Sequence, residues 1–376
     1  MNKVLVVGAG LFGLDVALEL DKNGFEVVLV EKNKQILTGT TLKSLLRVHS
    51  GLHYPRDFLT AQQSALGYAL FRDKYKDCIY DEFQNYYAIA KHNSKTSAEE
   101  FENFADKLGF PYHKISKSFH FKPEFNTANI SEMYHVKEGV LDIPKLRYKF
   151  IRKLNQSSIV VKNQEELVGI EQSAKSSSWI ATIKVTSSSS AIRLYREEFR
   201  FVVDATHLTS KCFNSIGDQP NMEYQITHML NIDYDAIAVG FTVIDGNFLT
   251  IQPLIENSKV LTTVYAPLPS VRARQISKSA PDHWLDANNL EELFSLETAQ
   301  KEILKAVSEW APGLLDSKIV STKTGIRVIE SNVRDSDRRR SLVRILAPNL
   351  FSIESTKLDH CIKVTEQLVN SITKLS

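Results

Sequence analysis

The sequence predicts an α/β fold: a Rossmann-like dinucleotide-binding domain with a second, antiparallel-β-rich domain. The first observation is an apolar strand over residues 3–7, followed directly by a glycine-rich turn that opens a helix. The second is another apolar strand, residues 26–31, which ends in an acidic residue at the distance expected of a dinucleotide site. The third is a strand-rich stretch over residues 222–268, whose pattern indicates an antiparallel sheet rather than further βαβ units.

Each glycine of the turn has its own physical role. Gly8 lets the chain leave the first strand sharply, Gly10 lets a pyrophosphate approach the backbone, and Gly13 lets the helix pack closely on the strand. The helix, expected over residues 11–23, directs unpaired N–H groups and a positive dipole end at the phosphates. Glu31 is placed to accept hydrogen bonds from ribose hydroxyls, and its charge disfavours NADP. The alternative interpretation is a glycine-rich turn in an unrelated α/β protein.

The rest of the chain predicts helices and strands in an order that returns to the first domain at the end. A strand followed by a helix at both chain ends suggests one domain built from distant segments. A run of serines, Ser187–Ser190, is interpreted as a hairpin turn. We expect helices at 57–76, 98–109, 144–154, 290–311 and 357–374, and strands at 158–162, 166–171, 179–185, 199–204 and 349–354.

Composition narrows the function classes. The 376 residues are 43% hydrophobic and 24% charged, with a net charge of +2, which gives no case for nucleic-acid binding. Cys78, Cys212 and Cys361 are widely spaced, which indicates reduced thiols in a cytoplasm rather than a disulfide framework or a metal site. No apolar run is long enough to span a membrane. The arginine-rich segment 334–340 is interpreted as a solvated loop, with phosphate recognition on a larger substrate as the alternative.

Six segments then carry a resemblance to a known family. Three positions depart from the family pattern: His207, where glycine is usual, Glu354 before the terminal helix, and Val328, where proline is usual. The segments are residues 8–31, 39–56, 138–144, 201–206, 324–327, and the terminal strand and helix with residues 355–357 between them. Together they resemble the D-amino-acid oxidase superfamily of flavoproteins, which includes glycine oxidase, sarcosine oxidase, glycerol-3-phosphate dehydrogenase and L-2-hydroxyglutarate dehydrogenase.

The resemblance implies an FAD-binding domain of the GR2, or D-amino-acid oxidase, type. That domain is expected to consist of residues 1–80, 136–215 and 321–376, and the substrate domain of residues 81–135 and 216–320. The residues expected to contact FAD are Gly8, Gly10, Leu11, Phe12, Gly13, Glu31, Lys32, Thr40, Arg47, His49, Ala205, Thr206, Thr356 and Lys357.

The resemblance also places candidate catalytic groups beside the flavin. His49 or His53 is expected to accept the proton of a substrate hydroxyl. The alternatives are that one histidine only hydrogen-bonds backbone or cofactor, or that His49 anchors the flavin covalently. Arg327 is expected to bind a substrate anion through its guanidinium fork, with an ion pair to a nearby acid such as Glu330 as the alternative. Two further residues, Tyr54 and Arg56, are expected to line the substrate cavity.

The predicted function is an FAD-dependent oxidoreductase of the cytoplasm. It would oxidise a CH–NH or CH–OH bond of a small anionic substrate by hydride transfer to flavin N5, with O₂ or another compound as the electron acceptor. No second GxGxxG motif follows residue 13, so the organic substrate itself is expected to reduce the flavin. The alternatives are a non-redox flavoenzyme of sugar or nucleotide-sugar metabolism and a non-catalytic binding protein that retains the fold.

Overall fold

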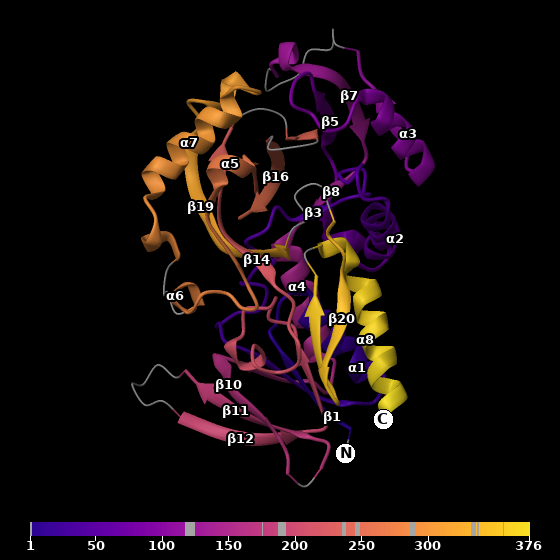
Figure 1. Cartoon of the computed structure of the whole chain (residues 1–376), viewed down its shortest axis with the longest axis vertical. Coiled ribbons are helices and arrows are strands. Elements are labelled where there is room, and N and C mark those ends of the chain that lie inside the picture. The colour runs from indigo at the N-terminus through magenta and orange to yellow at the C-terminus, as the bar shows by residue number, and fades with distance from the viewer. Residues whose placement is uncertain are drawn as a thin grey trace.

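A six-stranded sheet forms the lower part of the computed structural model (Figure 1). Its order is β20-β21-β13-β1-β2-β9, and all neighbouring pairs are parallel except β20 with β21. The strands are β1 Lys3–Val7, β2 Glu26–Glu31, β9 Val160–Asn163, β13 Phe201–Asp204, β20 Leu342–Ala347 and β21 Leu350–Glu354. The structure describes residues 2–116, 125–174, 176–186, 193–234, 238–244, 249–285, 290–331, 336, 338–355 and 357–376.

Both faces of the four central strands, β21, β13, β1 and β2, are covered, which explains why these strands are almost entirely buried, whereas the edge strands β20 and β9 are partly exposed. On one face, alternate residues such as Val4 and Val6 pack against helices α1, α4 and α8. On the other face, Leu5 and Val7 pack with Trp179 of a three-stranded antiparallel sheet, β10-β11-β12. The helices are α1 Leu11–Lys22, α4 Ile143–Asn155 and α8 Cys361–Leu375, and the covering strands are β10 Glu165–Gln172, β11 Trp179–Val185 and β12 Arg193–Phe199.

A nine-stranded sheet forms the upper part of the molecule (Figure 1). Its order is β18-β14-β17-β16-β15-β5-β7-β6, with β19 paired to the long strand β14, and it is antiparallel apart from the β15–β5 pair. The strands are β5 Gln84–Ala90, β6 Tyr112–Lys114, β7 Ile130–Val136, β14 Met222–Asp233, β15 Val239–Ile244, β16 Thr250–Glu256, β17 Lys259–Tyr265, β18 Val271–Ser277 and β19 Lys318–Glu330.

Helices cover parts of this second sheet. Ile303 and Val307 of α7, Leu296–Ser308, join a core cluster with strands β14 to β17. Phe101 of α3, Ala98–Leu108, joins another cluster with β5 and β7. The remaining long helix is α2 Phe58–Tyr75. The smaller elements are α5 Pro267–Ser270, α6 Asp282–Leu285 and a three-stranded sheet of β3 Arg47–Val48, β8 Gly139–Leu141 and β4 Ile79–Tyr80.

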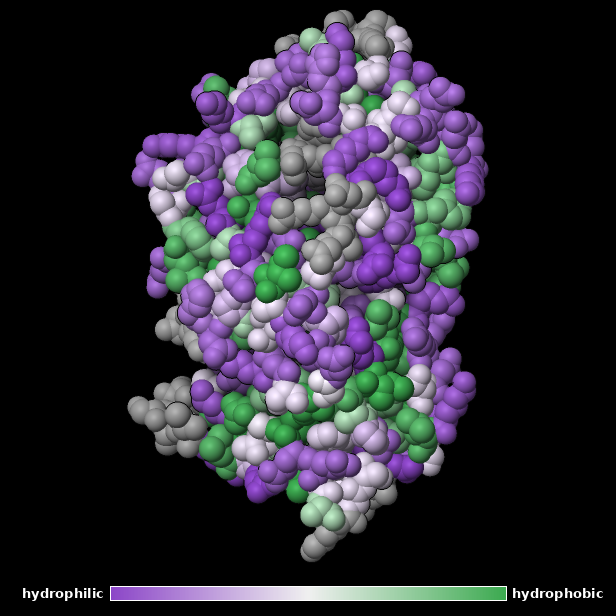
Figure 2. All heavy atoms as spheres, viewed as in Figure 1, coloured by the Kyte–Doolittle hydropathy of each residue, from purple (hydrophilic) through white to green (hydrophobic). Residues whose placement is uncertain are grey.

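The chain ends lie side by side at the base of the six-stranded sheet (Figure 1). Arg200 connects them, because it donates to Asn2 Oδ1 at 2.6 Å and to the Leu375 carbonyl at 2.8 Å. On the face drawn in Figure 2, hydrophobic groups are interspersed with hydrophilic side chains, and one of the larger groups lies in the lower half, around α8, β20 and the β10–β12 sheet. Within the described part of the chain, no helix combines the length and apolar character needed to cross a bilayer.

The predicted fold class is confirmed, with corrections to individual elements. The expected helix over 290–311 is shorter, because a 3-10 turn at Leu290–Leu293 precedes α7. The terminal helix begins at Cys361 rather than at 357, after another 3-10 turn. The strands that the sequence does not predict include β5, β6, β12, β18, β19 and β20. The proposed domain boundary at 321 falls inside β19, which belongs to the nine-stranded sheet; the division into domains stays a prediction. The predicted turn at 187–190 lies outside the described residues.

Candidate active site

The three glycines of the turn occupy different steric environments. Gly8 has φ +101°, in the region that favours glycine, and a Cβ there would lie 2.9 Å from the Ala205 carbonyl oxygen. A Cβ on Gly13 would lie only 1.9 Å from the carbonyl oxygen of Gly8, so α1 packs directly on the turn. A Cβ on Gly10 would meet, among the described residues, only the Thr41 hydroxyl at 3.4 Å. Space is therefore open beside Gly10, at the N-terminus of α1, where a pyrophosphate would bind.

Polar groups around the turn fit a dinucleotide. The Glu31 carboxylate accepts the backbone N–H of Ala9 at 2.8 Å and that of Asn33 at 2.9 Å. Because a carboxylate has about four lone-pair positions, Glu31 braces the turn and keeps capacity for ribose hydroxyls. The Thr41 hydroxyl accepts the N–H of Leu11 at 3.2 Å, one of the donors that an α-helix leaves unpaired at its start. The residues present therefore fit an FAD diphosphate and ribose.

Residues 204–208 lie against the glycine-rich turn and form a wall beside it. The N–H of Ala205 donates to the Val7 carbonyl at 2.9 Å, and Thr206 donates from its backbone and hydroxyl to the Asp204 carboxylate. His207 and Leu208 have φ +60° and +58°, which explains why glycine is usual at position 207 in the family. Burial lowers the pKa of His207 to about 4, so its ring is neutral near neutral pH.

A cavity of about 600 Å³ opens beyond this wall, within the usual size range of ligand pockets. It is lined by the segment after β2, by strands of the nine-stranded sheet and by residues 357–359. Its described lining is strongly cationic, with eight basic side chains and one acidic side chain. These are Lys43, Arg47, Arg56, Lys95, Arg274, Arg327, Arg339 and Lys357, with Asp359 as the acid.

Arg47 is committed to a buried ion pair. Its guanidinium donates to Glu138 at 3.0 Å, to the Tyr87 hydroxyl at 2.5 Å and to the Thr242 hydroxyl at 3.1 Å. The backbone and side chain of Ser50 also donate to Glu138, at 3.0 and 2.9 Å. This network fixes the chain segment that carries both candidate histidines, so Arg47 positions the cavity wall. Its predicted contact with FAD stays a prediction.

His49 and His53 both line the cavity, with their ring centroids 6.3 Å apart. Burial, with Lys357 and Arg47 nearby, lowers the pKa of each imidazole well below its ordinary value. Each ring is therefore neutral at neutral pH, the state that can accept a proton. The buried Nδ1 atom of each has no hydrogen-bond partner among the described residues.

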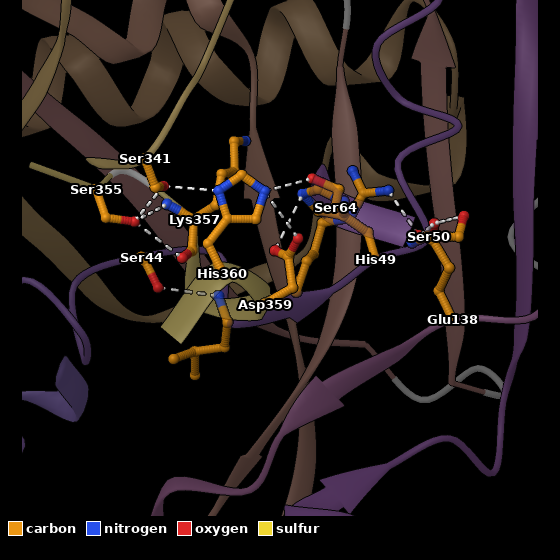
Figure 3. A network of polar contacts seen from close by, with 12 residues as sticks. Ser44, His49, Ser50, Ser64, Glu138, Ser341, Ser355, Lys357, Asp359 and His360 are labelled. Carbon is orange, nitrogen blue, oxygen red and sulfur yellow. Dashed lines mark hydrogen bonds and ion pairs between the residues drawn. The ribbon is translucent and has the colours of Figure 1, made fainter. Parts of the chain in front are cut away.

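Asp359 connects His49 to a polar network beside the cavity (Figure 3). Its carboxylate lies 3.7 Å from His49 Nε2 and 3.5 Å from His360 Nε2. His360 lies between the hydroxyls of Ser64 and Ser341, at 2.9 and 2.6 Å, and burial lowers its pKa to about 3. This neutral ring fixes the position of the 3-10 turn that carries Asp359.

Lys357 and Asp359 form a buried charge pair at the cavity. Burial lowers the pKa of Lys357 to about 8 and raises the pKa of Asp359 to about 7, while each charge favours the other. The Lys357 ammonium also lies 4.5 Å from the ring centroid of Tyr54. Tyr54 is buried at the cavity, and its hydroxyl has no partner among the described residues. Both residues line the cavity, and their predicted contacts with FAD and with substrate stay predictions.

Arg327 extends from β19 into the cavity. Its guanidinium donates to the Tyr265 hydroxyl at 2.9 Å. Its strand, β19, pairs with β14 along its length. The alternative ion pair with Glu330 is not formed, because Glu330 pairs with Arg338. Arg56 also lines the cavity. Arg327 thus presents a guanidinium that is oriented by a tyrosine rather than neutralised by a carboxylate.

Some predicted contacts lie away from the cavity, and the sequence missed others. Lys32 is exposed beyond the end of β2, and Phe12 packs at the edge of the core below the turn. Thr40 lines the cavity, whereas Thr356 lies outside the described residues. The cavity residues that no sequence pattern singled out include Lys95, Gln225, Tyr265, Arg274 and Asp359. Lys43 and Arg339, which also line it, belong to segments 39–56 and 334–340 noted in the sequence.

A family model described as FAD dependent oxidoreductase matches residues 3–352. A curated relative, "FAD-dependent monooxygenase kojA" of Aspergillus flavus, is 25% identical over 285 residues, which are 70% of this chain and 60% of that protein. The chain spans 58% and 60% of the length of the first curated relatives that it matches.

Solved structures share the fold. A glycine oxidase from Geobacillus kaustophilus aligns with a TM-score of 0.71 at 13% identity, over 100% of this chain and 96% of that one. An L-α-glycerophosphate oxidase from Mycoplasma pneumoniae with FAD bound gives a TM-score of 0.75 at 15% identity, over 99% and 95%. The predicted family resemblance and the predicted FAD cofactor are confirmed.

Proposed function

Because the chain belongs to the FAD-dependent oxidoreductase family, with FAD as its cofactor, we propose that it oxidises a CH–NH or CH–OH bond of a small anionic substrate. Bound FAD would accept the substrate hydride at N5, and O₂ or another compound would take up the electrons. The open space beside Gly10, the first N–H groups of α1 and the carboxylate of Glu31 would hold its diphosphate and ribose.

The single observation that carries the proposal is the arrangement inside the cavity. Arg327, held by Tyr265, faces the same space as two neutral histidines whose Nδ1 atoms lack partners. A guanidinium can bind a carboxylate or phosphate in a fork, and this contact would fix the position of the carbon to be oxidised. The cationic lining favours an anionic substrate over a neutral one.

His49 and His53 have different importance for the two kinds of bond. Oxidation of an alcohol requires a base for the hydroxyl proton, and a neutral imidazole within hydrogen-bond reach can accept it. A neutral amine can lose hydride without that help. Glycine oxidase and L-α-glycerophosphate oxidase, which share the fold, are named for an amine and an alcohol substrate, so the fold accommodates either bond.

Anaerobic mixing tests the proposal. The purified holoprotein is mixed with matched pairs of acids that differ only in an α-amino or α-hydroxy group, such as alanine and lactate, and the visible absorbance of bound FAD is followed. Bleaching by one class of acid identifies the bond that is oxidised. One molecule of the corresponding oxo acid should form for each FAD that is reduced. If no acid of either class bleaches FAD that is bound in full stoichiometry, the proposal is wrong.

A further inference from the structure

A row of three polar side chains crosses the cavity face of the nine-stranded sheet. Gln225 of β14 is the register partner of Arg274 on β18 and of Arg327 on β19. Directly paired residues of antiparallel strands project from the same face of the sheet, and all three residues line the cavity. Two strand spacings separate the arginine backbones, a distance of about 10 Å.

The other face of these strands is apolar, so the three polar side chains of the row point to the cavity side of the sheet. Tyr224 and Ile226 of β14, Val328 of β19 and Ala273 of β18 pack in one hydrophobic cluster around Trp284. The residues next to them in sequence, Gln225, Arg274 and Arg327, therefore point to the other side. Strand pairing alone brings two guanidinium groups to one wall of the cavity.

Gln225, in the middle of this row, has an amide oxygen without a hydrogen-bond donor among the described residues. Its Nε2 donates to Glu223 Oε1 at 2.7 Å, which fixes the orientation of the amide because a carboxylate only accepts. The other amide atom, Oε1, is buried without a hydrogen-bond partner among the described residues, and Gln225 is only 5% exposed. A buried acceptor without a donor is costly, so a donor group of a ligand is expected there.

Arg274 remains accessible to such a ligand. Its side chain is 37% exposed, and its Nε lies 3.8 Å from Glu223 Oε1. This ion pair involves Nε, the inner nitrogen of the guanidinium, and the long separation leaves Arg274 only loosely held. At the other end of the row, Arg327 is oriented by its hydrogen bond to the Tyr265 hydroxyl.

We propose that Arg274, Gln225 and Arg327 together recognise a substrate with two acidic groups and a hydrogen-bond donor between them. Arg327 takes one acidic group and Arg274 takes the other, and an N–H or O–H of the ligand donates to Gln225. The inference rests on the proposed function, because it extends the anion site that Arg327 begins. Arg274 is then the residue that distinguishes dianions from monoanions.

Binding of two acids that lack an oxidisable group tests the inference. Glutarate and butyrate have similar chains and differ by one carboxylate, and their binding to the holoprotein is measured from the change in the bound-FAD spectrum at constant ionic strength. We expect glutarate to bind at least about tenfold more tightly, since a second acid would make charge-assisted hydrogen bonds. A third probe, 2-carboxyethylphosphonate, separates preference for a second carboxylate from preference for a phosphonate.

Two arginine variants assign the effect. Arg274→Gln should remove the preference for glutarate while butyrate binding stays unchanged. Arg272→Gln is the matched control, because Arg272 lies on the same strand but pairs with Glu302 at 2.5 Å and does not line the cavity. Equal affinities of wild type for the two acids, or a preference that survives Arg274→Gln, would overturn the inference.

The outcomes also separate this inference from the function on which it rests. If butyrate binds, Arg327→Gln abolishes that binding and glutarate has no advantage, then the second anion site is wrong and the proposed function stands. If neither acid changes the FAD spectrum and no amino or hydroxy acid bleaches it, both are wrong.

Discussion

Gly10 and Gly13 allow cofactor binding to be separated from folding. Gly10→Ala adds a methyl group whose only close neighbour among the described residues is the Thr41 hydroxyl, at an ordinary contact distance of 3.4 Å. Gly10 is the N-cap of α1, and alanine is a poorer N-cap than glycine, so the free energy of unfolding of the apoprotein should fall by about 1 kcal/mol or less.

The same methyl group would occupy the space of the pyrophosphate. Loss of two charge-assisted hydrogen bonds between backbone N–H groups and phosphate, each worth about 1.5–3 kcal/mol, would weaken FAD binding by about a hundredfold or more. Titration of the apoprotein with FAD, followed by quenching of flavin fluorescence, measures this change directly.

Gly13→Ala is the matched contrast. Its new Cβ would lie 1.9 Å from the Gly8 carbonyl oxygen, about 1.5 Å closer than the 3.4 Å at which ordinary contact begins. Helix α1 would have to move off the strand, at a cost of about 1–3 kcal/mol or more. Urea unfolding of both apoproteins compares the two. The reasoning is refuted if Gly10→Ala binds FAD like wild type, or if it destabilises the apoprotein as much as Gly13→Ala does.

Three further substitutions test other parts of the site. Glu31→Gln places an amide NH₂ against a backbone N–H, so the apoprotein should lose about 1–3 kcal/mol in urea unfolding, and an unchanged midpoint would contradict the bonds described for Glu31. The pKa of Lys357 is lowered to about 8 by burial even though the Asp359 carboxylate opposes that effect, so Asp359→Asn should lower this pKa further and shift a pH titration of the bound-FAD spectrum to lower pH; a shift upward would contradict that pairing. His53→Gln should slow FAD bleaching by hydroxy acids by about 10²–10⁴-fold and should slow bleaching by amino acids less. Equal bleaching rates with hydroxy acids in wild type and His53→Gln would show that His53 is not the base.

The first βαβ unit could be predicted in detail because its signals are local. The three glycines and Glu31 lie within 24 residues, and their spacing after an apolar strand indicates a dinucleotide site without knowledge of distant segments. His207 stands where glycine is usual in the family, and its φ of +60° lies in the region that favours glycine. In both places, a short local pattern of residues carries the signal.

The cavity wall could not be predicted in the same way, because distant segments build it. Gln225, Arg274 and Arg327 meet only through the register of three strands, and no spacing in the sequence indicates that register. Arg47 was placed near the flavin from its segment, but its partner Glu138 lies 91 residues further along the chain. Such pairings depend on tertiary structure, which a pattern of residues does not contain.

The rate of FAD bleaching under anaerobic conditions, measured against substrate concentration for wild type and Arg327→Gln, tests the central claim most directly. Arg338→Gln is the control, because Arg338 pairs with Glu330 and does not line the cavity. Loss of the fork should raise the substrate concentration for half-maximal bleaching by about 10–100-fold, with FAD still bound, and the control should behave like wild type. Unchanged concentration dependence in Arg327→Gln would show that the substrate does not bind at the anion site that we propose.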